Sequence, residues 1–170
     1  MRFDMSNTIT ILNSQEDVEK CIELFIEHTT SDYISHSEII CGRAIDQDIW
    51  APELSQRLRD RLKLSLDNRS VIVALLKNKR SELIGFCIIA IESTRHTRHG
   101  RIAWIEDIVI HSDYRGKKLG TKLIIWATDF LTSNNVKKVF IESGLRNKNA
   151  HRFFKNKGFI QTSIVMMKQL

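Results

Sequence analysis

The residues with the clearest chemical potential form a basic, glycine-containing segment between two apolar stretches. An apolar run ends at Ile108–Ile110, and Leu119 opens a long apolar repeat with helical spacing. Between them lies the sequence HSDYRGKK, which includes Gly116, and Gly120 follows just after it. A loop of this kind directs successive backbone N–H groups, and the positive end of the following helix, at one point. The segment therefore predicts a site for an anion such as a phosphate.

The glycine pattern limits which phosphate compounds fit this segment. The Walker A pattern G-x-x-x-x-G-K-S/T is absent, so ATP and GTP are poor candidates. The two glycines let the backbone approach a ligand closely, and Arg115, Lys117, Lys118 and Lys122 add positive charge. A solvated basic turn before an ordinary helix is the alternative interpretation.

A second segment of the same kind runs from Glu142 to Phe159, again as strand, polar loop and helix, with Gly158 near its end. Together the two segments resemble the GCN5-related N-acetyltransferase (GNAT) superfamily. The family's loop pattern, R/Q-x-x-G-x-G/A, corresponds to Arg115–Gly120. Its later pattern, N-x-x-A-x-x-F-Y-x-x-x-G-F, corresponds to Asn147–Phe159. Two motifs in the right order, each on a strand–loop–helix unit, are far more specific than either alone.

The predicted elements agree with the fold that this resemblance implies. Apolar alternation and runs predict strands, and apolar residues spaced three and four apart predict helices. Strands are expected at 8–12, 71–76, 83–91, 101–110, 136–142 and 160–167, and helices begin near 14, 37, 52, 119 and 149. The expected fold class is α+β. We expect a single GNAT domain over residues 1–170, with a central mixed, twisted sheet of about six to seven strands flanked by helices.

The resemblance also implies an activity, the direct transfer of an acetyl group from acetyl-CoA to a primary amine. It implies that the backbone of Ile108, Val109 and Ile110 holds the pantetheine arm and the thioester, with an N–H of Val109 or a neighbour polarising the carbonyl. Asn147 would bond the pantetheine arm. The pyrophosphate would be cradled by the basic segment, namely Arg115, Gly116, Lys117, Lys118, Leu119, Gly120 and Thr121.

Two carboxylates are candidates for the base that deprotonates the acceptor amine, since a protonated amine is no nucleophile. Glu142 ends a strand five residues before Asn147. The resemblance to ribosomal-protein acetyltransferases implies a catalytic base at this position. Glu106 is expected to share a strand face with Trp104 and Ile108, and apolar neighbours favour a raised pKa. Each carboxylate could instead pair with a nearby Arg or Lys. Asp107 and His151 are weaker candidates.

Two positions depart from the family pattern. Lys118 stands where the loop often has glycine, as in glucosamine-phosphate acetyltransferase relatives, so cofactor binding is expected to survive. Phe154 stands where a tyrosine usually protonates the departing thiolate. Water or Ser143 is expected to assist instead, because a thiol with a pKa of ~8.5 leaves readily as thiolate. Tyr33 is the alternative acid, whereas Tyr114 marks the turn before the loop.

The acceptor is left open by the sequence. The residues expected to set it, about 25–65 and 93–100, carry no motif. A small molecule is expected rather than a protein N-terminus or lysine. The missing tyrosine keeps a second hypothesis open, a catalytically impaired, acetyl-CoA-binding regulatory protein. A nucleic-acid-binding module built on the basic loop is a third.

Composition and cysteine usage narrow the class of protein. The 170 residues carry 26 Lys+Arg and 20 Asp+Glu, a net charge of +6, with 42% hydrophobic residues, which is typical of a globular protein. Three scattered cysteines and no C-x-x-C favour free thiols over a disulfide framework or a zinc site. The H-x-x-H pair of His96 and His99 lacks a third ligand, so no metal is expected. We expect a cytoplasmic protein without membrane or nucleic-acid partners, and a homodimer is possible.

Overall fold

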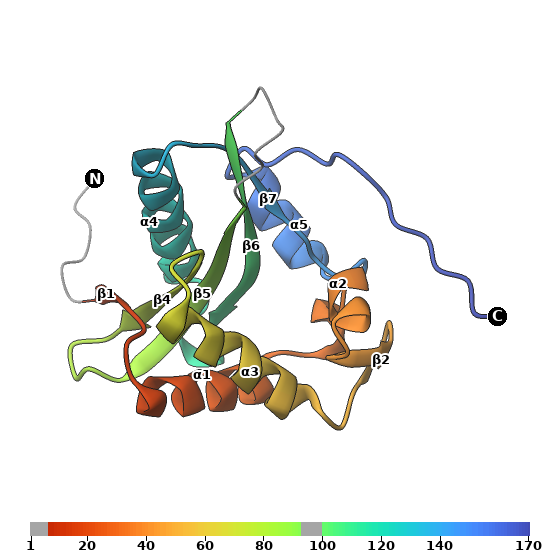
Figure 1. Ribbon diagram of the computed structural model, residues 1–170, viewed down its shortest axis with the longest axis horizontal. Coiled ribbons are helices and arrows are strands. Elements are labelled where there is room, and N and C mark those ends of the chain that lie inside the picture. The colour runs from red at the N-terminus through yellow and green to blue at the C-terminus, as the bar shows by residue number, and fades with distance from the viewer. Residues whose placement is uncertain (1–6, 93–99) are drawn as a thin grey trace. The chain divides into compact units, whose positions relative to one another are not determined.

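The computed structural model of the chain describes residues 7–92 and 100–170 (Figure 1). The chain divides into two compact units. The first lies within Met1–Thr29 and Ser55–Glu142, and the second lies within Thr30–Leu54 and Ser143–Leu170. Each unit is built from two stretches that are distant in sequence.

The first unit is organised around a mixed five-stranded sheet. Its strand order is β1-β4-β5-β6-β7; the β6–β7 pair is parallel, and the β1–β4, β4–β5 and β5–β6 pairs are antiparallel. The strands are β1 (Thr8–Ile11), β4 (Val71–Lys77), β5 (Leu83–Glu92), β6 (Arg101–Ile110) and β7 (Val136–Ile141). The central strands β4 and β5 are buried along most of their length, as their apolar runs predict.

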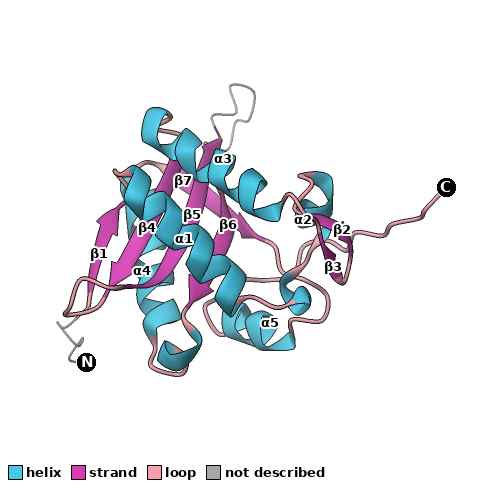
Figure 2. Ribbon diagram, turned by 90° about the horizontal axis from the view of Figure 1, so that it is seen from below, coloured by secondary structure: helices cyan, strands magenta, loops and turns pink. Residues whose placement is uncertain are grey.

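Helices cover both faces of this sheet (Figure 2). The helices α1 (Gln15–His28) and α3 (Leu54–Asp67) lie on one face, and α4 (Leu119–Ser133) lies on the other. Ser14 caps α1 by accepting a hydrogen bond from the Asp17 N–H at 3.1 Å, as its sequence predicts. The core holds apolar side chains from all three helices and the sheet, including Phe25, Leu58, Leu62, Phe86 and Leu123.

The second unit contains short elements and one longer helix. They are a 3₁₀ turn, η1 (Ser31–Tyr33), then α2 (His36–Ile40), the two-stranded sheet β2 (Ala44–Asp46) and β3 (Ile49–Trp50), and α5 (Lys148–Lys155). Ser35 and Glu38 form a capping box at the start of α2. The short strands β2 and β3 were not predicted, because three and two residues are too few for a visible alternation.

The predicted α+β architecture with a mixed sheet is confirmed, but two details differ from expectation. In the described residues the main sheet has five strands rather than six or seven, and two further short strands form a separate sheet. The predicted last strand, residues 160–167, is not a strand: it is exposed, and its backbone bonds to no other strand in the described part of the chain. Its apolar residues gave the strand pattern, but a strand also requires a partner.

The α3 helix offers a matched test of the core. Leu62 is fully buried, whereas Leu64 on the same helix is 44% exposed. We expect Leu62→Ala to lower the free energy of unfolding by about 2–5 kcal/mol, since it leaves a cavity. Leu64→Ala should change it by about 0.5 kcal/mol or less. Urea denaturation measures both, and equal losses would show that the packing of α3 is misassigned.

Candidate active site

The strand β6 is paired on both sides along only half of its length. Antiparallel pairing with β5 continues from Glu92↔Ile102 to Gly85↔Ile110, whereas parallel pairing with β7 ends at Ile105↔Ile141. The stretch 106–110 therefore extends past the last β7 pair. The backbone that the sequence assigned to the cofactor, Ile108–Ile110, lies in this stretch.

A β-bulge lies where the β7 pairing ends. Ile88 lies opposite Asp107 and Ile89 opposite Ile105, so Glu106 is the extra residue on β6. A bulge bends its strand, increases the local twist and re-aims side chains, and bulges are common beside active sites. The bend explains why β7, which pairs with β6 without a register shift from Ile102 to Ile105, pairs no further.

Hydrogen-bonded and non-hydrogen-bonded residue pairs alternate between β5 and β6, and this alternation decides which backbone groups of β6 point away from β5. The His111 N–H donates a hydrogen bond to the Ile84 carbonyl at 3.0 Å, so these two residues, which lie opposite each other, form a hydrogen-bonded pair. Because such pairs alternate in an antiparallel ladder, Val109 directs its N–H and C=O toward β5, and Ile108 and Ile110 direct theirs away from it. The Ile110 carbonyl accordingly accepts a bond from Arg115 Nε at 3.1 Å.

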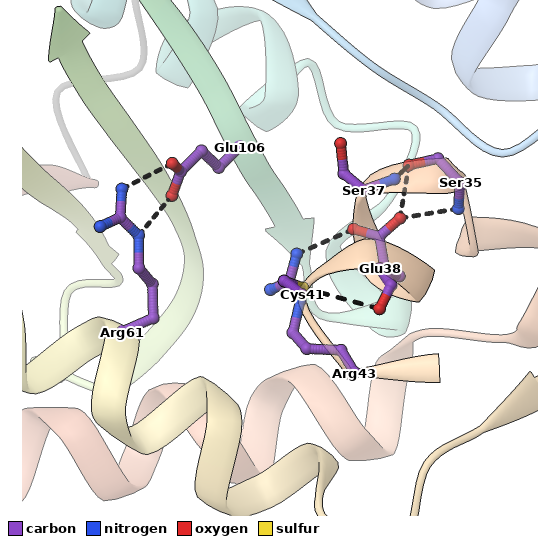
Figure 3. Close-up of polar contacts among 7 residues, drawn as sticks. All are labelled: Ser35, Ser37, Glu38, Cys41, Arg43, Arg61 and Glu106. Carbon is purple, nitrogen blue, oxygen red and sulfur yellow. Dashed lines mark hydrogen bonds and ion pairs between the residues drawn. The ribbon is translucent and has the colours of Figure 1, made fainter. Parts of the chain in front are cut away.

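Glu106 is held by an arginine rather than lying among apolar groups alone (Figure 3). Its carboxylate accepts two hydrogen bonds from Arg61 of α3, at 2.7 Å from Nε to Oε2 and 2.5 Å from Nη2 to Oε1. Such a bidentate pair fixes the orientation of the carboxylate. Both side chains keep more than a quarter of their surface exposed, so the pair is accessible to a substrate.

Asp107 and Glu142 have different environments. Asp107 is 2% exposed, beside the buried Cys87, whose thiol pKa is raised by burial and by the Asp107 charge. A carboxylate this deep is poorly placed to contact a substrate. Glu142 directly follows β7 and is half-buried.

The basic segment after β6 has the backbone conformation of an anion site. A 3₁₀ turn, η2 (Ser112–Tyr114), is followed by Gly116 with φ +76° and Lys118 with φ +62°. A Cβ on Gly116 would meet nothing within 4 Å, so this glycine serves the backbone angle rather than packing. Left-handed residues near one another in a turn gather N–H groups into a concave nest that binds anions.

The helix that follows presents an uncapped N-terminus. Lys118 is the N-cap of α4, its side chain makes no capping hydrogen bond, and no acidic residue lies in the first turn. Orphan N–H groups at the positive end of a 15-residue helix favour an anion. Loop and helix therefore carry the predicted residues Gly116–Thr121 in a conformation that fits a phosphate group.

Most of the positive side chains in this segment are used for structure. The guanidinium of Arg115 bonds to the carbonyls of Ile110 and His28, which ties the loop to β6 and to the end of α1. The Lys117 ammonium lies 4.9 Å from the centre of the Tyr114 ring, and Lys122 bonds to the Asn7 carbonyl. The predicted anion site would therefore depend mainly on backbone groups.

Two histidines pack beneath the loop. The rings of His28 and His111 lie 3.9 Å apart, and His28 Nδ1 accepts a long hydrogen bond from the Ser112 N–H at 3.4 Å. Burial lowers the pKa of His28, and the neighbouring His111 and Arg115 charges lower it further. The neutral form of His28 therefore supports the folded loop.

The second unit holds the other predicted site residues. Asn147 is the N-cap of α5, where its side-chain oxygen accepts from the Ala150 N–H at 3.2 Å, which leaves the amide NH₂ for another partner. Ser143 is half-buried. Sequence reasoning missed the importance of Gly144. A Cβ there would lie 2.3 Å from the Asp32 carbonyl oxygen and 2.5 Å from that of Ile34, so the position requires glycine.

The candidates for a proton donor also lie in this unit. Phe154 is 8% exposed and contacts the rings of Phe153 and Phe159, so its side chain is part of an aromatic cluster. Tyr33 is half-buried, with its ring 6.4 Å from that of Trp50. His151 is exposed on α5.

A buried ion pair supports the segment before β2. Glu38 accepts hydrogen bonds from the Ser35 N–H at 2.7 Å and from Arg43 Nη2 at 2.8 Å (Figure 3). Both charged side chains are almost fully buried. Sequence patterning missed this pair, since neither residue type is normally buried.

In residues 7–92 and 100–170, no group of three or more His, Cys, Asp or Glu side chains could hold a metal ion. The H-x-x-H pair of His96 and His99 lies outside the described residues. Among the described helices, none is both long and apolar enough to cross a membrane.

Comparison with known families agrees with this geometry. Residues 32–159 match the sequence profile of the GNAT acetyltransferase family. The chain belongs to the GNAT family. It is accordingly an N-acetyltransferase, and the GNAT family uses acetyl-CoA.

Individual relatives of this GNAT chain support the same conclusion. The aminoalkylphosphonate N-acetyltransferase of Salmonella typhimurium is 27% identical over 164 residues, which are 94% of this chain and 99% of the relative. A tetramutant of the BH1408 protein of Bacillus halodurans has the same fold, with a TM-score of 0.74 and 13% identity over 96% and 99% of the two chains. An aminoglycoside N-acetyltransferase solved with CoA gives a TM-score of 0.68 at 13% identity, over 96% and 94%.

The lowered pKa of His28 predicts a pH dependence of stability. Because the folded state disfavours the charged form, this contribution is present above the unfolded pKa of ~6.5 and is lost as the pH falls below it. We expect His28→Asn, which keeps an acceptor for Ser112, to lose less unfolding free energy than the wild type between about pH 8 and pH 5. His151→Asn on the exposed face of α5 is the control. An unchanged pH dependence in His28→Asn would contradict the assignment.

Proposed function

We propose that this GNAT enzyme transfers the acetyl group of acetyl-CoA to a primary amine on a small molecule that also carries an anionic group. The observation that carries the cofactor assignment is the uncapped α4 N-terminus preceded by the left-handed residues Gly116 and Lys118. The acceptor class is supported by the relative that matches nearly the whole chain, whose name gives an aminoalkylphosphonate as its substrate.

The proposed roles of the cofactor residues follow from the backbone geometry. Gly116–Thr121 supply N–H groups for the pyrophosphate. When bound, acetyl-CoA supplies the acetyl thioester. Ile108 and Ile110 direct their backbone groups toward the β7 side of β6, and the pairing with β7 ends before it reaches them. An N–H of one of these two residues is therefore favoured over that of Val109 as the donor to the thioester carbonyl. Asn147 keeps an amide NH₂ that suits a bond to the pantetheine arm.

Glu106 is the base that the geometry favours. It is the bulged residue of β6, two positions before Ile108, and Arg61 fixes its orientation. Each carboxylate oxygen accepts one bond from Arg61 and keeps a second lone pair that can accept a proton from the amine. Glu142 remains the second candidate. Ser143, water or Tyr33 would assist the leaving thiolate, because Phe154 has no proton to give.

An amine panel tests the proposed acceptor class. Release of free CoA would be measured with acetyl-CoA and aminoalkylphosphonates, phosphorylated amino sugars, polyamines and peptides with free N-termini. We expect the highest kcat/KM with the amines that carry an anionic group. Binding of acetyl-CoA without turnover on any amine would instead support the regulatory protein that Phe154 suggests. Preference for polyamines or peptides would refute the acceptor class but not the reaction.

The base is tested by Glu106→Gln and Glu142→Gln. We expect Glu106→Gln to lower kcat by about 10²–10⁴-fold, as for loss of a general base, with little change in the affinity for CoA. Glu82→Gln, in the β4–β5 turn, is the control.

A purely structural role for the Arg61–Glu106 pair is distinguished by Arg61→Met. That role predicts equal losses in Arg61→Met and Glu106→Gln and no change in the acid limb of the pH–rate profile. Full activity of the Glu106→Gln/Glu142→Gln double variant would show that neither carboxylate is the base.

A further inference from the structure

The guanidinium of Arg61 has more hydrogen-bond donors than its pair with Glu106 uses. An arginine side chain carries one N–H on Nε and a pair of them on each of Nη1 and Nη2. The bonds to Glu106 take the N–H of Nε and one N–H of Nη2. Among the described residues, no other group accepts a hydrogen bond from Arg61. Both N–H groups of Nη1 and the second one of Nη2 therefore remain for a ligand.

These remaining donors form an outer edge of the guanidinium, next to the edge that holds Glu106. Figure 3 shows the third guanidinium nitrogen directed away from Glu106. The two edges share Nη2, so an anion bound at the outer edge lies beside the carboxylate. The Arg61 side chain keeps 28% of its surface exposed, so this edge is accessible. Such a planar fork matches two oxygens of a carboxylate, phosphate or phosphonate group.

A second arginine of α3 shows what a purely structural pair of the same kind looks like. Arg59 donates to the Glu19 carboxylate of α1 from Nε at 2.9 Å and from Nη2 at 2.8 Å. Its Nη1 also donates, to the Gln56 side-chain oxygen at 3.1 Å. All three nitrogens of Arg59 are thus used in joining α3 to α1 and to its own helix, whereas Arg61 leaves Nη1 open.

The position of α3 separates this outer edge from the proposed pyrophosphate site. α3 lies on the face of the main sheet opposite α4, whose N-terminus carries that site (Figure 2). An anion on Arg61 is therefore a group of the acceptor rather than of the cofactor. Arg57, one turn earlier on the same side of α3, is exposed and pairs with no carboxylate in residues 7–92 and 100–170. It adds positive charge on this side of the helix.

We infer that Arg61 binds the anionic group of the acceptor while it holds Glu106, so that one guanidinium orients the base and selects the substrate's charge. This inference rests on the proposed transfer to an amine that carries an anion. A zwitterionic acceptor matches the ion pair head to tail. Its ammonium group lies toward the Glu106 carboxylate, and its oxyanion lies on the outer edge of Arg61.

Two amines that differ in charge test this inference, aminoethylphosphonate and its uncharged diethyl ester. We expect the wild type to have the higher kcat/KM with the phosphonate. Arg61→Met should lower this preference by about 10–10²-fold, mainly through the KM of the phosphonate, because a charge-assisted bidentate contact is lost. Loss of Glu106 orientation affects both amines and cancels in the ratio. Arg59→Met, which breaks the structural pair on the same helix, should keep the wild-type preference.

Ethylphosphonate, which has the anion but no amine, measures the binding step by itself. At saturating acetyl-CoA, where the cofactor site is filled, it should inhibit competitively with the amine, and Arg61→Met should raise its inhibition constant by about 10–10²-fold. A wild type that does not prefer the phosphonate to its ester would refute the proposed acceptor class. A wild type with that preference whose Arg61→Met variant keeps it, or binds ethylphosphonate equally tightly, would overturn this inference alone.

Discussion

The end of the β6–β7 pairing at Ile105 and Ile141 is the constraint on which the candidate site depends. A parallel partner along the whole of β6 would pair with the side of the strand toward which Ile108 and Ile110 direct their backbone groups. The bulge at Glu106 bends β6 at this point, so that β5 alone continues beside it as a strand. One extra residue thus separates the half of β6 that pairs with two strands from the half in which the proposed cofactor backbone lies.

In the loop that follows β6, backbone groups rather than side-chain charges form the proposed site. Arg115 resembles a phosphate ligand in sequence, yet its guanidinium fixes the loop by bonding to the Ile110 and His28 carbonyls. Lys118 takes the left-handed conformation that a glycine usually supplies. Lys118 therefore replaces the family's glycine without changing the backbone conformation, and the loop carries the strain of one non-glycine residue with a positive φ.

Much of this arrangement could be predicted from sequence because it depends on local patterns. The strand runs at 71–76 and 101–110, the Ser14 cap and the two strand–loop–helix motifs are such patterns, and the structure contains the corresponding elements. The bulge at Glu106 was invisible, since it arises from register between two strands. The Arg61–Glu106 pair and the close approach of Asp32 to Gly144 join residues distant in sequence, so no pattern indicates them.

The last predicted strand shows that a strand-like sequence pattern does not by itself establish a strand. Residues 160–167 have the composition of a buried strand, but composition does not specify a partner, and the described part of the chain pairs no strand with them. The aromatic position Phe154 is a similar case. The motif indicated a departure from the usual tyrosine, whereas only the structure shows that the ring is packed between Phe153 and Phe159.

The central claim is that the backbone of β6 past its bulge and the α4 N-terminus form one cofactor site. Residue-resolved amide chemical shifts measured during a titration with CoA test it most directly. We expect the largest shifts at Ile108, Ile110 and Gly116–Thr121, and smaller ones at Val109, whose N–H faces β5. Shifts confined to other parts of the chain, or larger at Val109 than at both of its neighbours, would contradict it.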